Sequence, residues 1–272
     1  SVTATMPSHD ARGDRNDQPS EPDDQAQRHN GDDGVKIQSG ATGTVVGSAG
    51  FGNTISSNFS GIAVLNGTTA NTTIQANRIG TNAAGTGSFG NVWGVFVADA
   101  QTTLVGGAGA GEGNVIANST ATGVVAIGTA DGLRVLRNSV FGNAGLGIDL
   151  DLDGVTANDF QDIDTGPNAR ENFATITGVS TTGTQVLISG TYNGSTNATI
   201  DLDFYASAAA DPTGYGEGQR YLGSTTITTD GNGDATFSVT LTAAVAAGEA
   251  VSSIATESGV NRSSEFSQAV AA

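Results

Sequence analysis

The sequence predicts an all-β protein in which a short parallel β-helix precedes an immunoglobulin-like β-sandwich. Forty glycines against five prolines, with abundant Thr, Asn, Val and Ile, favour short strands joined by turns. The first half repeats a fixed order of short apolar segments, whereas the second half alternates apolar and polar residues with period two. A chain of 272 residues is long enough for about two domains.

Changes in composition divide the chain into four parts. Residues 1–34 hold both histidines, many acidic residues and almost no aliphatic ones, so we predict an acidic, extended N-terminal arm. Residues 35–150 are the predicted β-helix coils, residues 151–171 an acidic linker loop, and residues 172–272 the sandwich. The arm cannot bury enough apolar surface to order itself, and a neighbouring subunit is the partner we expect to hold it.

A repeated pattern of asparagine, glycine and aliphatic residues defines the coils. Its three classes of strand occur in an order that never changes, which is typical of a solenoid. Asparagine stands two residues before an aliphatic residue, at intervals of 24, 37 and 24 positions, at Asn53, Asn77, Asn114 and Asn138. Glycine directly precedes an aliphatic residue at Gly34, Gly61, Gly94, Gly123 and Gly147, and a third strand carries Val45, Ile74, Leu104 and Val135. Stacked coils would align the asparagines in a hydrogen-bonded ladder, and four to five coils at ~4.8 Å each would make a rod of roughly 20 Å.

Alternation within the glycine-preceded strands places Leu65, Phe96 and Val125 on one outer face. An apolar outer stripe needs a cover, so we predict an interface at these three residues. The C-terminal domain, the N-terminal arm and another molecule are all consistent with that role.

Six aspartates follow the last coil within a short stretch: Asp149, Asp151, Asp153, Asp159, Asp162 and Asp164. No lysine or arginine lies between Asn138 and Asn168 to neutralise them. Oxygen-only ligands with Gly154 at a tight bend suit a hard cation, so we predict a calcium site made of these six residues. The Asp-x-Asp-x-Asp-Gly start resembles an EF-hand loop, but Phe160 stands where that loop needs its glutamate, so we infer a calcium loop of another kind. Leu150, Leu152 and Ile163 are expected to anchor it; a solvated acidic linker is the alternative.

From Asn172 onward, seven short segments each carry one apolar face, as in an immunoglobulin-like sandwich. The candidate strands are Thr175–Val179, Gln185–Tyr192, Thr199–Ala206, Tyr221–Thr229, Ala235–Leu241, Ala250–Thr256 and Ser263–Ser267.

Several motifs carry a resemblance to a known family. They are Asn77–Thr86, Gly145–Leu150, Asp164–Asn168, Asp211–Gln219 and Ser264–Ser267. They resemble bacterial and archaeal surface proteins with a right-handed parallel β-helix of the pectate-lyase-like superfamily, often built into long secreted chains. The resemblance spans about residues 35 to 270 and implies a right-handed helix and a secreted, extracellular or cell-surface location. It says little about activity, because this fold hosts many functions.

The charge and composition restrict the partners. A formal charge of −17, from 27 acidic against 10 basic residues, argues against nucleic acid and against an anionic membrane surface. No apolar run approaches the ~20 residues of a membrane span, and the absence of cysteine rules out disulfides and thiol catalysis.

We therefore expect a secreted, calcium-stabilised structural or adhesive cell-surface protein without catalytic residues. Neither end of the predicted solenoid has an obvious amphipathic capping helix, so we expect head-to-tail assembly into a filament or surface layer through the arm and the solenoid ends. The alternatives are a polysaccharide-active enzyme of the uronate lyase or epimerase type, using Arg78, Arg134 and Arg137, or a carbohydrate-binding module using Trp93, Phe96, Tyr215 or Tyr221.

Overall fold

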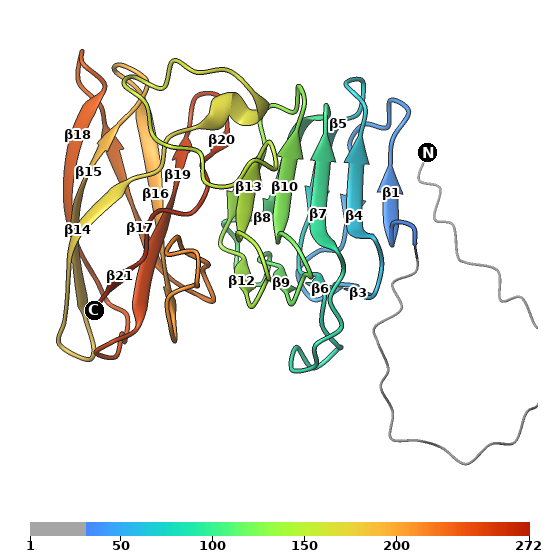
Figure 1. Ribbon diagram of the computed structural model, residues 1–272, viewed down its shortest axis with the longest axis horizontal. Coiled ribbons are helices and arrows are strands. Elements are labelled where there is room, and N and C mark those ends of the chain that lie inside the picture. Colours follow the sequence, from blue (N-terminus) through green and yellow to red (C-terminus); the bar gives the residue numbers. More distant parts are fainter. Residues whose placement is uncertain (1–30) are drawn as a thin grey trace, which may run out of the picture.

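The computed structural model describes residues 31–272, and it shows an all-β chain with one short 3₁₀ helix, η1 (Pro167–Arg170), in that range. The predicted arm, residues 1–34, lies almost wholly outside the described residues. Two regions lie end to end along the long axis (Figure 1). We call residues 34–150 the stacked region and residues 172–272 the antiparallel region.

The chain of the stacked region passes repeatedly through three parallel sheets, and we call one passage a circuit. The first sheet contains β1 (Val35–Ile37), β4 (Ser60–Leu65), β7 (Trp93–Ala98), β10 (Val124–Ile127) and β13 (Ile148–Leu150). The second contains β2 (Val45–Val46), β5 (Ala70–Ile74), β8 (Gln101–Gly106) and β11 (Arg134–Leu136). The third contains β3 (Thr54–Ile55), β6 (Arg78–Ile79), β9 (Val115–Ala117) and β12 (Ser139–Phe141). Every circuit thus adds one strand to each sheet, as the repeat predicts.

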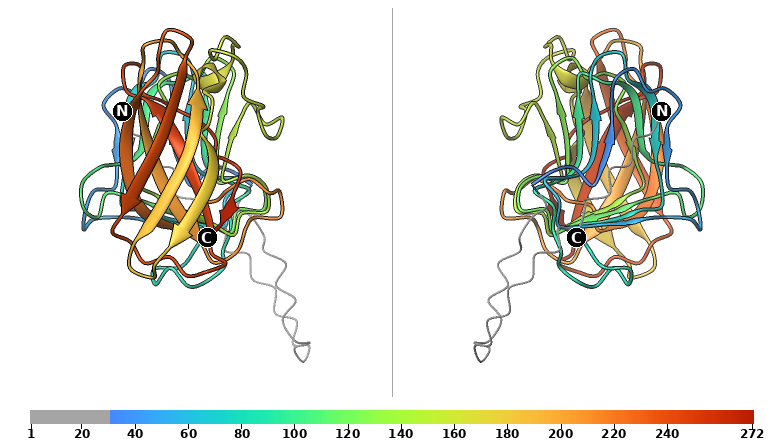
Figure 2. Two further views of the ribbon diagram at one scale, coloured as in Figure 1. Left: turned by 90° about the vertical axis from the view of Figure 1, so that its left-hand side faces the viewer. Right: turned by 90° about the vertical axis from the view of Figure 1, so that its right-hand side faces the viewer.

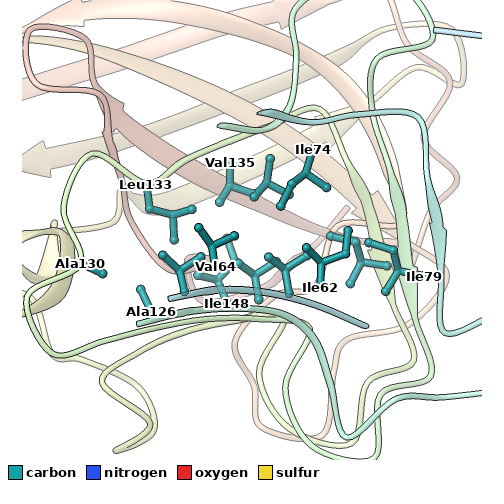
Figure 3. Close-up of a cluster of buried hydrophobic side chains, with 14 of the residues drawn as sticks. Ile62, Val64, Ile74, Ile79, Ala126, Ala130, Leu133, Val135 and Ile148 are labelled. Carbon is teal, nitrogen blue, oxygen red and sulfur yellow. The ribbon is translucent and has the colours of Figure 1, made fainter. Parts of the chain in front are cut away.

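The aliphatic residues of successive circuits stack into one core. Ile62 pairs with Val95, Val95 with Val124 and Val124 with Ile148, and all four side chains are buried. Figure 3 shows members of this cluster from all three sheets facing one another. Each repeat therefore buries its apolar face only against its neighbours, which is how stacked repeats gain stability.

The recurring glycine before each aliphatic residue has a steric cause. A Cβ placed on Gly61, Gly94 or Gly123 would come within 3.0 Å of the carbonyl oxygen of the corresponding glycine on the next strand. Real Cβ atoms essentially never approach another atom so closely. Successive circuits can approach this closely here only because glycine has no side chain.

The four aliphatic residues predicted for the third strand lie in one sheet but in two different rows. Val45, Ile74, Leu104 and Val135 all lie in the second sheet, but they do not form one row. Val45 and Leu104 belong to the row that also contains Thr73 and Arg134, and Val45 is 61% exposed. Ile74 and Val135 belong to the neighbouring inward row. The sequence could not separate the two rows, because apolar residues stand side by side at positions 45–46 and 104–105.

The asparagine ladder is confirmed. The Nδ2 of Asn53 donates to Oδ1 of Asn77 over 2.8 Å, Asn77 donates likewise to Asn114 over 3.1 Å, and Asn114 to Asn138 over 2.9 Å. The backbone N–H of each donor residue binds the same oxygen. A second, unpredicted relay links Asn58 to Asn91 on the following circuit over 3.1 Å. These bonds satisfy buried polar groups at the bends between successive strands, which would otherwise have no hydrogen-bond partners.

Two antiparallel sheets make up the C-terminal region. One has the order β14 (Thr175–Thr181), β15 (Val186–Asn193), β18 (Asp234–Leu241). The other has the order β17 (Arg220–Thr228), β16 (Thr199–Ser207), β19 (Ala250–Glu257), β20 (Arg262–Ser263), with β21 (Val270–Ala271) also paired to β19. Ile188, Leu202 and Phe237 share one buried core between the sheets, and Figure 2 shows the two layers of strands.

Six of the seven strands predicted for this region are present to within two residues. The prediction of Ser263–Ser267 is wrong beyond Ser263. The Oγ atoms of Ser264 and Ser267 each accept a backbone N–H of β19 over 3.0 Å, while the N–H groups of both serines still donate to β19 carbonyl oxygens, so a side chain replaces the backbone acceptor there. The short strand β21 was not predicted.

Candidate metal centre and the ends of the stacked region

The linker leaves β13 and is fastened between the two regions by a buried asparagine. Asn168 accepts the N–H of Leu133 through Oδ1 over 2.7 Å. Its Nδ2 donates to the carbonyl oxygens of Leu133 and Ser263, each over 2.8 Å. One side chain thus holds the last circuit, the linker and β20 together.

The structure separates the six predicted aspartates. Asp149 lies in β13 and is 6% exposed; burial and the charge of Asp153 raise the pKa of its carboxyl. Asp151 and Asp153 both accept from the Nη2 of Arg170, over 2.6 and 2.9 Å. The expectation that no base neutralises this loop is wrong for these two residues, because Arg170 lies just beyond the range considered and folds back over them.

Asp159, Asp162 and Asp164 come together as a group of half-buried carboxylates. One oxygen from each lies within 4.8 Å of the others. Burial, opposed by the N–H of Asn172 and assisted by the charges of Asp164 and Asp159, raises the pKa of Asp162 to about 7. Burial and the charge of Asp159 also raise the pKa of Asp164. Within residues 31–272, the Oδ1 atoms of Asp159 and Asp164 are buried and accept no hydrogen bond.

Asn172, which is 3% exposed, sets the shape of this loop. Its backbone N–H donates to Oδ1 of Asp162 over 2.9 Å, and its Nδ2 donates to the carbonyl oxygen of Asp159 over 2.7 Å. Gln161 is tied to β15, because its N–H donates to Oδ1 of Asn193 over 2.8 Å. These bonds hold three carboxylates at one point, an arrangement that suits a hard divalent cation.

The expected anchors of the loop behave differently from one another. Leu150 is fully buried in β13, but Leu152 is 39% and Ile163 is 73% exposed. The prediction that Leu152 and Ile163 anchor the loop is therefore wrong. Polar bonds from Asn168 and Asn172 perform that role, and hydrophobic patterning does not reveal such bonds.

Glu171 is a further carboxyl beside this group that the sequence did not indicate. It is 2% exposed, and its Oε1 accepts the hydroxyl of Tyr192 over 2.7 Å. Burial, and then the charge of Asp162, raises the pKa of Glu171 to about 9. Its Oε2 has no hydrogen-bond partner among the described residues. No periodic pattern marks Glu171, because it lies in irregular chain between η1 and β14.

The antiparallel region covers the C-terminal end of all three parallel sheets. At β12, Val140 and Gly218 exchange two backbone hydrogen bonds of 2.9 Å. At β13, the N–H of Leu150 donates to Oε1 of Glu265 over 2.9 Å. At β11, the N–H of Val135 donates to Oγ of Ser263 over 2.9 Å. This end is therefore capped by strands and loops of the antiparallel region, without a capping helix.

Glu217 binds the turn at Gly142 and Asn143 at this end. It accepts three donors, namely the N–H of Gly142 over 2.6 Å, the N–H of Asn143 over 3.0 Å and the Nδ2 of Asn143 over 2.7 Å. Asn143 in turn accepts the N–H of Ser119 over 2.9 Å. The carboxylate stands where a further circuit would place its next acceptor.

The predicted outer stripe is only partly exposed. Leu65 and Phe96 are half-buried, and Val125 is fully buried. Helix η1 of the linker lies against β10 and β13 at this end of the row. Farther along, Trp93 stacks on Phe96 with ring centroids 4.8 Å apart, and its other neighbour Phe59 is 42% exposed.

The three arginines considered for catalysis do not converge. Arg78 lies in the third sheet, where it is exposed, whereas Arg134 lies in the second sheet, 3.8 Å from Asp201. Arg137 donates to the carbonyl oxygen of Ala108 and lies over the ring of Tyr221.

Comparison with known proteins gives no relative: no protein-family model and no curated protein matches the chain. Among the described residues, no helix has the length and apolar character needed to cross a membrane. The fold and the side-chain geometry must therefore support any functional assignment.

Proposed function

We propose that this chain is a secreted, calcium-stabilised structural or adhesive protein of a cell surface. We interpret its stacked region as a short right-handed parallel β-helix and its antiparallel region as an immunoglobulin-like sandwich. The three parallel sheets visited in turn and their asparagine relays support the first interpretation. Two antiparallel sheets around one core support the second.

The observation that carries this proposal is that, within residues 31–272, the stacked region is capped by its own chain at one end and not at the other. Glu217, Gly218, Ser263 and Glu265 occupy the free edges of the last strands. At the other end, β1, β2 and β3 are the outermost strands of their sheets within the described residues. Figure 1 places this end farthest from the antiparallel region. Uncapped parallel strands present backbone donors and acceptors that a further chain can pair with.

Head-to-tail assembly follows if the open end of one molecule meets the antiparallel region of the next, with the N-terminal arm as a further contact. Such a contact does not close on itself, so it makes a filament or an extended layer. Calcium would stiffen the joint between the two regions by holding the linker carboxylates together.

Electron microscopy of the untreated protein, beside a sample stripped of calcium by a chelator, tests this function. We expect regular fibres that soften or dissociate on chelation. Val45→Lys on β2 and removal of residues 1–30 should both weaken assembly, whereas Phe89→Lys, in an exposed lateral loop, should not. Single compact particles in both samples would refute assembly.

The aromatic row of Phe59, Trp93 and Phe96 supports a second candidate, a carbohydrate-binding module. Exposed rings can stack on sugar rings, and this row lies on the outside of the stacked region. An enzyme of the uronate lyase or epimerase type is the less favoured form of this alternative, because Arg78 lies in a different sheet from Arg134. Glycan binding that is lost in Trp93→Ala would favour the module, and cleavage of a uronate polymer would favour the enzyme.

A further inference from the structure

We propose that one divalent cation binds between Asp159, Asp162 and Asp164, and that the buried carboxyl of Glu171 accepts a hydrogen bond from a water bound to that ion. This inference rests on the calcium stabilisation proposed above. It differs from the six-aspartate site of the sequence prediction, because it removes Asp149, Asp151 and Asp153 from the site and adds Glu171.

The spacing of the three aspartates fits a single ion. Calcium–oxygen bonds measure about 2.3–2.6 Å, so two ligands on opposite sides of an ion lie about 5 Å apart. One oxygen from each of the three carboxylates lies within 4.8 Å of the others. One ion can therefore contact all three without rearrangement of the loop backbone.

In the described part of the chain, no lysine or arginine side chain takes the place of an ion between these three carboxylates. The ion pairs there include none with Asp159, Asp162 or Asp164. Arg170, the nearest candidate, donates its Nη2 to Asp151 and Asp153 instead. Asp151 and Asp153 are thus bridged by an arginine, whereas no positive side chain is bonded to the three carboxylates of the proposed site.

Glu171 gives the independent indication of a ligand. It is 98% buried, since only 2% of it is exposed, and Tyr192 fixes its Oε1. Its Oε2 has no donor within residues 31–272. Asp162 is the charged residue that acts on it most strongly, and the N–H of the next residue, Asn172, donates to Asp162. A buried carboxyl oxygen without a partner, close enough to Asp162 to feel its charge, needs a hydrogen-bonding group that the described residues do not supply.

A metal-bound water provides that donor. The Glu171 oxygens are not among the atoms that lie within 4.8 Å of one another, so Glu171 does not complete the inner set directly. Calcium takes six to eight oxygen ligands and commonly keeps waters among them, and those waters bind outer-shell acceptors. The donor set contains only carboxylate oxygens, which favours calcium over zinc or copper.

Calorimetric titration of the full chain with calcium chloride, after treatment with a chelator, tests the site. We expect the native protein to bind one ion and Asp164→Asn to lose binding by more than tenfold. Glu171→Gln keeps an acceptor for Tyr192 and should weaken calcium binding by about tenfold, as outer-shell substitutions do. Asp153→Asn is the matched control and should bind calcium as tightly as the native protein, because Asp153 pairs with Arg170 and is not a ligand of the proposed site.

A melting curve in chelator separates binding from folding. If Glu171 acts only through the ion, Glu171→Gln should melt close to the native temperature without calcium, because glutamine keeps the size of the side chain and an acceptor for Tyr192. Native calcium affinity in Glu171→Gln, with a lower melting temperature in chelator, would show that Glu171 is only structural. Weaker binding in Asp153→Asn but not in Asp164→Asn would move the ion to the other aspartates. No calcium uptake by the native protein would overturn the site, whereas fibres formed without calcium uptake would leave the assembly proposal standing.

Discussion

Removing the carboxylate of Glu217 should destabilise the stacked region from its capped end. Glu217 is 8% exposed and accepts hydrogen bonds from three N–H groups of the last circuit. Hydrogen bonds to a charged acceptor contribute roughly 1.5–3 kcal/mol each, and a buried donor left without a partner costs about 1–3 kcal/mol. Water can reach part of the vacated site, so we expect Glu217→Ala to lower the free energy of unfolding by about 3–5 kcal/mol.

Glu217→Gln gives a graded comparison. The amide keeps one acceptor oxygen for Asn143 but turns a donor toward the N–H of Gly142, so about 1.5–3 kcal/mol should be lost. Glu249→Gln, which weakens a partly exposed ion pair with Arg220, should cost about 1 kcal/mol or less.

Urea unfolding followed by tryptophan fluorescence measures these changes in the right place. The chain has one tryptophan, Trp93 in β7, so its emission reports the stacked region. Circular dichroism follows all strands in the same samples. A loss below about 1 kcal/mol in Glu217→Ala would show that water replaces the carboxylate at little cost, and the capping argument would fail.

Three further predictions concern other polar groups. Asn114→Ala removes a ladder residue that is 1% exposed and bonded to Asn77, Asn138 and the carbonyl oxygen of Ile74, so we expect a loss of about 3 kcal/mol or more in urea unfolding; an unchanged midpoint would contradict this. Arg170→Gln breaks partly exposed pairs with Asp151 and Asp153 and should lower the melting temperature by only a few degrees, equivalent to about 1 kcal/mol. Burial raises the pKa of Glu265 from 4.5 to about 7, so the folded state retains a proton that the unfolded state releases. In chelator, the contribution of this proton to the free energy of unfolding should be complete below about pH 4.5 and lost as the pH rises through 7. A series of urea midpoints measured against pH should therefore be flatter for Glu265→Gln than for the native protein.

The repeat in the stacked region could be predicted because its physical causes recur at fixed places in the sequence. Glycine is required where one circuit meets the carbonyl of the next, and asparagine where buried amides relay hydrogen bonds. Both requirements repeat once per circuit. The choice between inward Val46 and outward Val45 could not be predicted, because both are valines.

The joint between the regions could not be predicted from the sequence in the same way. Glu217 and Glu265 lie 75 and 115 positions from the backbone groups that they accept at Gly142 and Leu150. Nothing local distinguishes them from surface glutamates. The acidic run did locate the candidate metal centre, but its composition alone could not show that Arg170 returns to bind Asp151 and Asp153.

The asparagine relay also bears on how the length of such a molecule can change. The side-chain amides of Asn77 and Asn114 bond only to groups of the adjacent circuits, and the sequence separations of 24 and 37 residues show that a relay accepts circuits of different size. Duplicating one whole circuit would therefore preserve every junction, including the one at Glu217. Loss of a fraction of a circuit would instead shift all later asparagines out of line. Gene rearrangements in whole circuits would thus lengthen the rod in steps of ~4.8 Å while its cap stayed unaltered.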